Sequence, residues 1–285
     1  MGLLDGKVAL ITGGARGQGR AHAVTCAREG ADVVLFDLVE QVATVNYPMS
    51  TPADLAETVR LVEEHDRRAL AIRGDVRDQS QLDDAVAQAI AQFDTIDILI
   101  ANAGIWALKP FWELTDDDWA DTVDINLTGV WRAAKAVAPH MIERRSGSIV
   151  MTSSTNGLEP GAGYANYVSA KYGVVGLSKS VALELAPYGI RCNCINPGAV
   201  RTGMTDNQDG YDLFAGHPGG TAADMEQGGY AFTALAGVSF MDPQVIADGA
   251  LFLNSHLAAA ITGVALPIDA GHLLLPGVNQ NPVRA

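Results

Sequence analysis

Tyr167 and Lys171 are the residues of this sequence whose types and spacing point most directly to chemistry. They stand four residues apart in a segment with helical periodicity, Tyr167–Leu185, and therefore share one helix face. A phenol, with a pKa of about 10, is a poor base at neutral pH. A neighbouring ammonium favours the phenolate and is expected to lower that pKa. Tyr167 could then take a proton from an alcohol or give one to a carbonyl oxygen, although such a pair taken alone is usually an ordinary surface pair.

Ser154 is a candidate third member of this group. The dipeptide Ser153-Ser154 ends the strand-like segment Ser148–Thr152 and precedes the helical segment that carries Tyr167. A hydroxyl at Ser154 can hold the substrate oxygen and stabilise the charge that develops on it.

A glycine-rich loop, Thr12 to Arg20, lies between a strand-like run and a helical pattern. Gly13, Gly17 and Gly19 permit a tight turn, close approach of the backbone to a pyrophosphate, and close packing of helix on strand. The N–H groups and dipole of the following helix favour phosphate there. A glycine-rich turn without a ligand is the alternative, and the strand before and the helix after argue against it.

The next strand ends in Phe36-Asp37-Leu38. A carboxylate at this position, roughly 20 residues after the last glycine, can bond both hydroxyls of an adenosine ribose. The same charge repels a 2′-phosphate, so NAD is favoured over NADP as the cofactor. Arg16 keeps NADP open as an alternative, because an arginine in the loop can meet a phosphate.

Composition excludes several other classes of protein. The 285 residues are 48% hydrophobic and 18% charged, which predicts a sizeable core rather than disorder. A net charge of −14 argues against nucleic acid as a partner. No apolar run approaches the roughly 20 residues of a membrane span, and residues 1–6 do not resemble a signal peptide, so a cytoplasmic protein is expected.

Cysteine and histidine spacing does not predict a metal site or a disulfide framework. The three cysteines, Cys26, Cys192 and Cys194, show no CxxC spacing, and the last two alternate along a predicted strand. We interpret them as small buried core residues. The six histidines are scattered, and His217 is interpreted as a surface residue rather than a ligand.

Strand-like and helix-like segments alternate along the whole chain. Apolar runs predict strands at Val8–Thr12, Asp32–Phe36, Ala69–Arg73, Ile96–Ala101, Ser148–Thr152, Arg191–Ile195 and Val264–Ile268. Helical periodicity appears at Ala53–His65, Gln81–Gln92, Trp119–Ile142 and Tyr167–Leu185. This alternation predicts an α/β fold: one Rossmann-type, doubly wound domain over residues 1–285, with a seven-stranded parallel sheet.

Three stretches depart from this pattern. Residues 38–54 form a polar insertion near the cofactor, followed by helix-start signals at Thr51, Pro52 and Asp54. Residues 201–238 are rich in Gly and Asp and are predicted to be a long substrate loop or lid. The C-terminal tail, 272–285, is expected to be irregular.

Taken together, these motifs resemble those of the classical short-chain dehydrogenase/reductase family over essentially the whole chain. TGxxxGxG stands at Thr12–Gly19, NAG at Asn102–Gly104, YxxxK at Tyr167–Lys171 and PG at Pro197-Gly198. The resemblance implies an enzyme that interconverts an alcohol and a ketone by hydride transfer with NAD.

The resemblance also assigns roles to single positions. Asn126 matches the residue that holds a water in a proton relay through the lysine, and Ser154, thirteen residues before Tyr167, outranks Ser153. Tyr164 is not the catalytic tyrosine, because Val168 rather than a lysine follows it four residues on. The cofactor-binding set it implies is Gly13, Ala15, Arg16, Gly17, Gln18, Gly19, Asp37, Leu38, Asp75, Val76, Asn102, Ala103, Gly104, Tyr167, Lys171, Pro197, Gly198, Val200 and Thr202.

The insertion is similar to that of the carveol-dehydrogenase-like or mycofactocin-dependent subgroup of this family. That resemblance implies an insertion that covers NAD, which stays bound and is reoxidised by an external carrier such as mycofactocin. It also implies a cyclic, terpenoid-like secondary alcohol as substrate. An insertion of no special function is the alternative.

The substrate pocket is expected after Gly104, at Asn156-Gly157 and in the segment after Pro197-Gly198. The apolar side chains expected there are those of Trp106, Trp112, Met204 and Phe214. The alternative for each tryptophan is ordinary packing. Family members usually form homotetramers, and the apolar run Gly173–Leu177 is consistent with a helix face that packs against another copy.

Two other functions on the same fold remain alternatives. A non-catalytic NAD(P)-binding redox sensor cannot be distinguished by fold alone, but it has no use for the set Asn126, Ser154, Tyr167 and Lys171. An epimerase or dehydratase commonly carries an extra substrate domain, for which this chain is too short.

Overall fold

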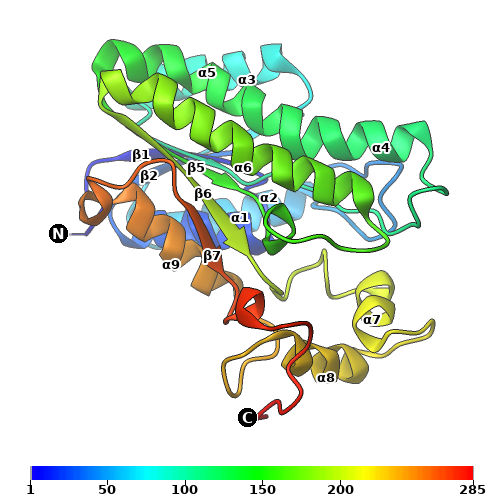
Figure 1. Ribbon diagram of the computed structural model, residues 1–285. Coiled ribbons are helices and arrows are strands. Elements are labelled where there is room, and N and C mark those ends of the chain that lie inside the picture. Colours follow the sequence, from blue (N-terminus) through cyan, green and yellow to red (C-terminus); the bar gives the residue numbers. More distant parts are fainter. Residues whose placement is uncertain (1, 285) are drawn as a thin grey trace.

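Within the described residues, 2–284, seven parallel strands form one sheet in the order β3-β2-β1-β4-β5-β6-β7. Figure 1 shows the sheet in the computed structural model, with helices on both faces. The strands are β1 (Val8–Thr12), β2 (Asp32–Asp37), β3 (Ala69–Arg73), β4 (Ile98–Ala101), β5 (Gly147–Thr152), β6 (Ile190–Pro197) and β7 (Ala265–Ile268). The predicted doubly wound fold is confirmed. Strand order reverses between β1 and β4, and ligands bind at such a switch point.

The helices form two layers, one on each face of the sheet (Figure 1). α3 (Gln79–Phe93), α4 (Asp116–Val123), α5 (Gly129–Arg144) and α6 (Ala165–Leu185) cover one face. α1 (Gly17–Arg28), α2 (Pro52–Glu63) and α9 (Pro243–Asn254) cover the other. Because both faces are covered, β1 and β4 are buried at every position, which explains why their sequences are apolar throughout.

Helix α2 begins as its sequence predicts. The Thr51 hydroxyl accepts a hydrogen bond from Asp54 N at 3.2 Å, and the Asp54 carboxylate accepts one from Thr51 N at 2.8 Å. Pro52 occupies the first helical position, where a missing N–H costs nothing. This double cap fixes the point at which the insertion 38–54 returns to the body of the protein.

The predicted loop over residues 201–238 is wrong in part, because the segment contains two helices. α7 (Gln208–Ala215) begins at an Asn207 cap, and α8 (Ala222–Phe232) begins at a Thr221 cap. Both helices lie beyond the end of the sheet, beside the C-terminal segment, as Figure 1 shows. The capping pair Thr221 and Asp224 was the available signal for α8.

The predicted helical segment Trp119–Ile142 is likewise not one regular helix. A π-helical turn, η1 (Asp124–Thr128), separates α4 from α5 and carries Asn126. Turns of this kind are rare and occur mostly at functional sites. Short 3-10 turns complete the structure at η2 (Thr155–Gly157), η3 (Ala186–Tyr188), η4 (His256–Ala258) and η5 (His272–Leu274).

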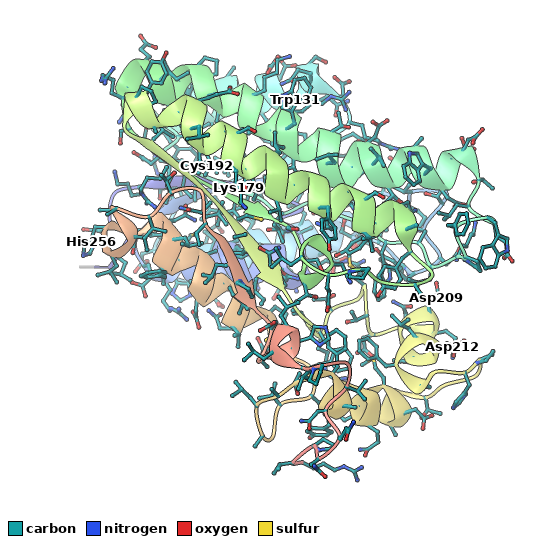
Figure 2. All side chains as sticks on the ribbon, in the orientation of Figure 1. Trp131, Lys179, Cys192, Asp209, Asp212 and His256 are labelled. Atoms are coloured by element: carbon teal, nitrogen blue, oxygen red, sulfur yellow. The ribbon has the colours of Figure 1, made fainter. Side chains whose placement is uncertain are left out.

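The cysteines are free and buried, as predicted, and Cys192 lies on β6 in Figure 2. Residues 2–284 contain no cluster of side chains suited to a metal ion. Over the same part of the chain, none of the helices combines the length and the apolarity that crossing a bilayer requires.

His22 is a buried histidine on α1 whose ring nitrogens have no hydrogen-bond partner among the described residues. Burial lowers its pKa from 6.5 to about 4, because the charged form cannot be solvated there. The unfolded chain therefore binds a proton in this range that the folded chain does not.

We expect the stability that depends on neutral His22 to be complete above pH 6.5 and to disappear as the pH falls toward 4. The loss is about 3 kcal/mol of unfolding free energy. Urea unfolding of wild type and His22→Leu at pH 7, 5.5 and 4.5 checks this. The variant should lose less stability on acidification, and equal slopes would contradict the interpretation.

Candidate active site

A cavity of about 490 Å³ opens at the carboxyl ends of the central strands. Its walls come from the glycine-rich loop, the insertion 38–54, the segments after β4, β5 and β6, helix α6 and the segment 201–238. Figure 2 places Asp209 and Asp212 on α7, which lies beyond the sheet on the cavity side. With the exception of Ala15 and Asn126, every residue predicted to be catalytic or to bind the cofactor lines this cavity.

The glycine-rich loop leaves a backbone cradle at the start of α1. Gly13 has φ +67°, and a Cβ there would lie 2.8 Å from Ala103 Cα. A Cβ at Gly19 would lie 1.9 Å from Gly13 O, so no larger residue fits at that position. Arg16, the residue before the helix, makes no side-chain cap. The first N–H groups of α1 therefore remain available to an anion, which is the geometry that a pyrophosphate requires.

Asp37 lies at the end of β2 with its carboxylate at the cavity wall. One oxygen accepts from Ala15 N at 2.9 Å, and the other accepts from Val39 N at 3.0 Å and from the Ser50 hydroxyl at 2.7 Å. Ala15, which is fully buried, thus supports the carboxylate rather than lining the cavity. A carboxylate fixed at this place can accept hydrogen bonds from the ribose hydroxyls of NAD and repels the 2′-phosphate of NADP.

Arg16 turns toward the insertion. Its guanidinium donates to the Pro48 carbonyl oxygen at 2.6 Å. Because this backbone contact occupies the Arg16 guanidinium, the presence of Arg16 does not favour NADP over NAD as the cofactor.

The turn after β4 holds the glycine-rich loop from the other side. The Thr12 hydroxyl accepts from Asn102 N and Ala103 N, each at 3.1 Å. The Asn102 amide donates back to Thr12 O at 3.1 Å and to Gly13 O at 3.3 Å. This exchange fixes the spacing between the ends of β1 and β4, where strand order reverses and the cavity opens.

At the adenosine end, Asp75 and Val76 line the cavity beside Leu38. The Asp75 carboxylate accepts from Arg77 at 2.7 to 3.1 Å, and Arg77 also contacts Asp121 on α4. The charge of Asp75 is therefore balanced by a partner on the protein.

Tyr167, Lys171 and Ser154 lie together in the interior, each less than a tenth exposed. The Lys171 Nζ donates to Thr152 O at 2.8 Å and lies 5.5 Å from the centroid of the Tyr167 ring. The Ser154 hydroxyl accepts from Asn156 N at 3.1 Å, which fixes its place at the end of β5. The sequence thus brings a phenol, an ammonium and a hydroxyl to one cavity wall.

The expected lowering of the Tyr167 pKa is wrong for this arrangement. Burial raises the pKa of Tyr167 to about 12, and the Ser154 hydroxyl only partly opposes this. Burial lowers the pKa of Lys171 to about 8. The ammonium faces the ring and the Thr152 carbonyl, so desolvation outweighs its attraction for the phenolate. Burial at this position thus favours the neutral phenol over the phenolate.

Asn126 lies behind the cavity wall rather than on it. It is fully buried, accepts from Ile105 N at 2.8 Å, and donates to Ile105 O at 2.7 Å. A Cβ at Gly104 would lie 3.3 Å from the Asn126 Oδ1 and 3.6 Å from the Lys171 Nζ. The amide and the ammonium therefore flank the same glycine, and they make no direct hydrogen bond to each other.

The segment after β6 forms another wall of the cavity. Asn196 donates to Ser154 O at 2.7 Å, and Gly198 N donates to Ile268 O at 3.0 Å. Thr202 faces the glycine-rich loop, because a Cβ at Gly17 would lie 3.4 Å from its methyl group. Pro197, Gly198, Val200 and Thr202 are therefore brought to the cavity as predicted.

The substrate end of the cavity is aromatic. Trp106, Met204 and Phe214 line it as predicted, whereas Trp112 does not, because it is 72% exposed and packs on Phe111. Trp106 lies against Tyr167, with ring centroids 6.4 Å apart. Tyr47, Tyr164, Leu213, Phe232 and Val278 also line the cavity, although their positions in the sequence did not predict this.

Comparison with known proteins agrees with this geometry. The family model described as short chain dehydrogenase matches residues 7–211. The chain is 43% identical to (-)-trans-carveol dehydrogenase of Rhodococcus erythropolis, over 96% of this chain and 100% of that one. Two solved structures are also similar. Carveol dehydrogenase from Mycobacterium avium in complex with NAD is 41% identical with a TM-score of 0.93, and it covers 96% of this chain and 100% of its own. A short chain dehydrogenase from Mycobacterium paratuberculosis bound to NAD is 37% identical with a TM-score of 0.87 and the same coverage.

The fold and the relatives therefore indicate the same chemistry as the site does, which is oxidation or reduction with NAD. The parts of the site that carry it are the phosphate cradle, the Asp37 carboxylate and the Tyr167–Lys171 pair. The chain belongs to the short-chain dehydrogenase/reductase family, in its carveol-dehydrogenase-like group, and is an NAD-dependent oxidoreductase acting on CH–OH groups.

Proposed function

We propose that the chain oxidises a cyclic, terpenoid-like secondary alcohol to its ketone with an NAD that stays bound and is reoxidised by an external carrier, mycofactocin. The observation that carries this proposal is the insertion 38–54, which forms a wall of the cavity and is tied to the catalytic end. The carveol dehydrogenases to which the chain is similar support the substrate class.

In this proposal the proton chemistry belongs to Tyr167. Tyr167 first passes its own proton to the relay through Lys171, and the resulting phenolate takes the proton of the substrate alcohol. Ser154 holds the substrate oxygen, and Lys171 stabilises the phenolate. NAD, when bound, supplies the acceptor for the hydride that leaves the carbinol carbon. Asn126 acts from behind the wall as the holder of the relay water, since its position beside Gly104 faces the same side as the Lys171 Nζ.

Four contacts favour an insertion that holds the cofactor in place. Ser50 donates to the ribose-binding Asp37, and Pro48 accepts from Arg16 in the glycine-rich loop. The Tyr47 hydroxyl, which is buried, accepts from Trp106 N at 3.3 Å beside the catalytic tyrosine. The Thr44 hydroxyl donates to Asp121 on α4 at 2.8 Å. These contacts lie at both ends of the cavity, so release of NAD requires several of them to break.

The competing redox-sensor hypothesis does not account for this arrangement. Burying an ammonium beside a phenol is costly, and a protein that only binds NAD gains nothing from it. A variant of Tyr167 distinguishes the two functions directly.

Tyr167→Phe removes the proton acceptor and leaves the cavity shape unchanged. We expect oxidation of secondary alcohols to slow by about 10³-fold while NAD binding stays within twofold of wild type. Stopped-flow absorbance of the NADH formed on the protein and the amount of NAD that co-purifies with each variant measure the two quantities. Tyr188→Phe, on the remote turn η3, is the matched control and should behave as wild type. Unchanged turnover in Tyr167→Phe would overturn the mechanism.

Bound NAD should survive extensive dialysis of the purified protein. Turnover of carveol should then need an artificial electron acceptor and gain little from added NAD. Rapid steady turnover on free NAD, with no NAD retained, would sink the proposal for cofactor retention but not the assignment of the reaction.

Thr44→Val should speed the exchange of bound NAD for labelled NAD by about fivefold, because one hydrogen bond that anchors the insertion is lost. Thr262→Val is the matched control, since it removes a hydroxyl that contacts Cys192 at the opposite end of the sheet. Equal exchange rates in the two variants would argue against the insertion as a latch.

We also infer that copies of the chain pack through α5 and α6 into a tetramer. Trp131, Tyr172 and Leu183 lie on these helices with 43%, 44% and 78% of their surfaces exposed, and Figure 2 shows Trp131 on the outer face of α5. Leu183→Glu should reduce the mass measured by light scattering, because a charge at an apolar interface is costly. Leu235→Glu, equally apolar and exposed but beyond the sheet, should leave the mass unchanged.

A further inference from the structure

The C-terminal tail, residues 272–284, lies along α8 at the substrate end of the cavity (Figure 1). Asn279 N donates to Ala231 O at 2.7 Å, and its side-chain amide donates to Thr233 O at 2.8 Å. Near the end of the tail, Val283 O accepts from Gly237 N at 2.7 Å. Val278, the residue before the Asn279 anchor, lines the cavity at its open edge, where it is 62% exposed. An irregular segment is thus held in one place by paired backbone contacts.

His272, at the start of this tail, is buried and contacts two other cavity walls. Its ring stacks on Phe232 of α8, with centroids 3.5 Å apart and an interplanar angle of 16°. Its Nδ1 lies 2.8 Å from Phe232 O, and its Nε2 lies 2.5 Å from the Glu159 carboxylate. Only 7% of the residue is exposed, so both polar contacts are largely shielded from water.

The imidazole ring of His272 bridges Phe232 O and the Glu159 carboxylate through its two nitrogens. A carbonyl oxygen can only accept, so the Nδ1 carries a proton and donates to Phe232 O. The Nε2 then shares a proton with the Glu159 carboxylate, and the contact is an ion pair whenever the ring is protonated. Neither partner belongs to the proton relay at Tyr167.

The bridge joins three segments that shape the substrate end. Glu159 lies between the cavity-lining residues Asn156 and Tyr164, on the segment that connects Ser154 to α6. Phe232 packs edge-on against Phe214 of α7, with centroids 5.6 Å apart, and both line the cavity. The tail itself carries Val278. Loss of His272 therefore releases the Glu159 segment from the other two, while the Asn279 contacts still hold the tail to α8.

We propose that the C-terminal tail forms part of the substrate site, with His272 as a positioning residue and Val278 as a determinant of substrate size. The inference rests on the proposed oxidation of cyclic alcohols. It adds that the tail helps to set which ring substituents the cavity accepts.

His272→Ala should raise the KM for carveol about tenfold and leave kcat within about twofold, because the walls that hold the ring loosen while the reacting groups stay in place. The affinity for NAD should not change. His256→Ala, an exposed histidine labelled in Figure 2, is the control for the loss of an imidazole. Glu159→Gln keeps a hydrogen-bond partner for the Nε2 and should retain a KM close to that of wild type. A fall in kcat with unchanged KM would overturn the positioning role.

Val278→Phe should lower kcat/KM for carveol relative to that for unsubstituted cyclohexanol by about tenfold, because the larger side chain fills space that the substituent needs. The ratio is unaffected by any loss of folded protein. Val283→Phe is the matched control, because Val283 lies on the same tail and is as exposed as Val278 (60% against 62%) but does not line the cavity, and it should leave the ratio unchanged. An unchanged ratio in Val278→Phe would overturn the specificity role.

Different results would contradict the proposed function and the proposed role of the tail. If wild type oxidises neither alcohol, the proposed function fails, and the binding of carvone to the NAD-loaded protein, followed as a shift in melting temperature, still tests the tail. Weaker carvone binding in His272→Ala and Val278→Phe than in their controls supports the inference, and equal binding overturns it.

Discussion

The Lys171 ammonium lies in the protein interior, 3% exposed, with the Thr152 carbonyl oxygen as its hydrogen-bond acceptor. Removing such a charge from water costs several kcal/mol, and only a well-placed set of dipoles offsets that cost. Burial accordingly lowers the Lys171 pKa to about 8 and raises the Tyr167 pKa to about 12. The proton chemistry requires the Lys171 ammonium and the Tyr167 hydroxyl to be shielded from water together. The neighbouring strands, helices and loops must therefore enclose both groups.

The fold meets this constraint with rigid elements. The Thr152 carbonyl belongs to the last residue of β5, and the Tyr167–Lys171 pair belongs to the first turns of α6, so strand and helix fix the distance between them. The Ser153 hydroxyl donates to Lys171 O at 2.8 Å and ties the two elements together. The π-helical turn η1 brings Asn126 to the rear of the same wall, where a regular helix would rotate the side chain away.

Much of this could be predicted from the sequence, because local rules determine it. The strands, the glycine-rich loop and the capped start of α2 follow from hydrophobic pattern and turn chemistry, and all were found. The pKa of Tyr167 could not be predicted, since desolvation depends on neighbours that are distant in the chain. Trp112 was misplaced for the same reason: its type suggests a pocket, but its contact with Phe111 holds it at the surface. Helix α8 was not predicted, although its start could have been, because the capping box of Thr221 and Asp224 is a local signal in the sequence.

β5 and α6 fix the reacting groups at the carboxyl end of the sheet. The two covers of the cavity, the insertion 38–54 and the segment 201–238, are long loops and short helices, so they need further contacts to hold them in place. Arg16 provides one such contact between the two covers. Its guanidinium donates to Pro48 O of the insertion, and a Cβ at Gly203 would lie 3.1 Å from its Nη1. Gly203 thus leaves the space through which the arginine reaches both segments. Arg16 is the residue before α1, at the phosphate cradle, so the insertion and the segment 201–238 both lie beside it there, and movement of either disturbs the other.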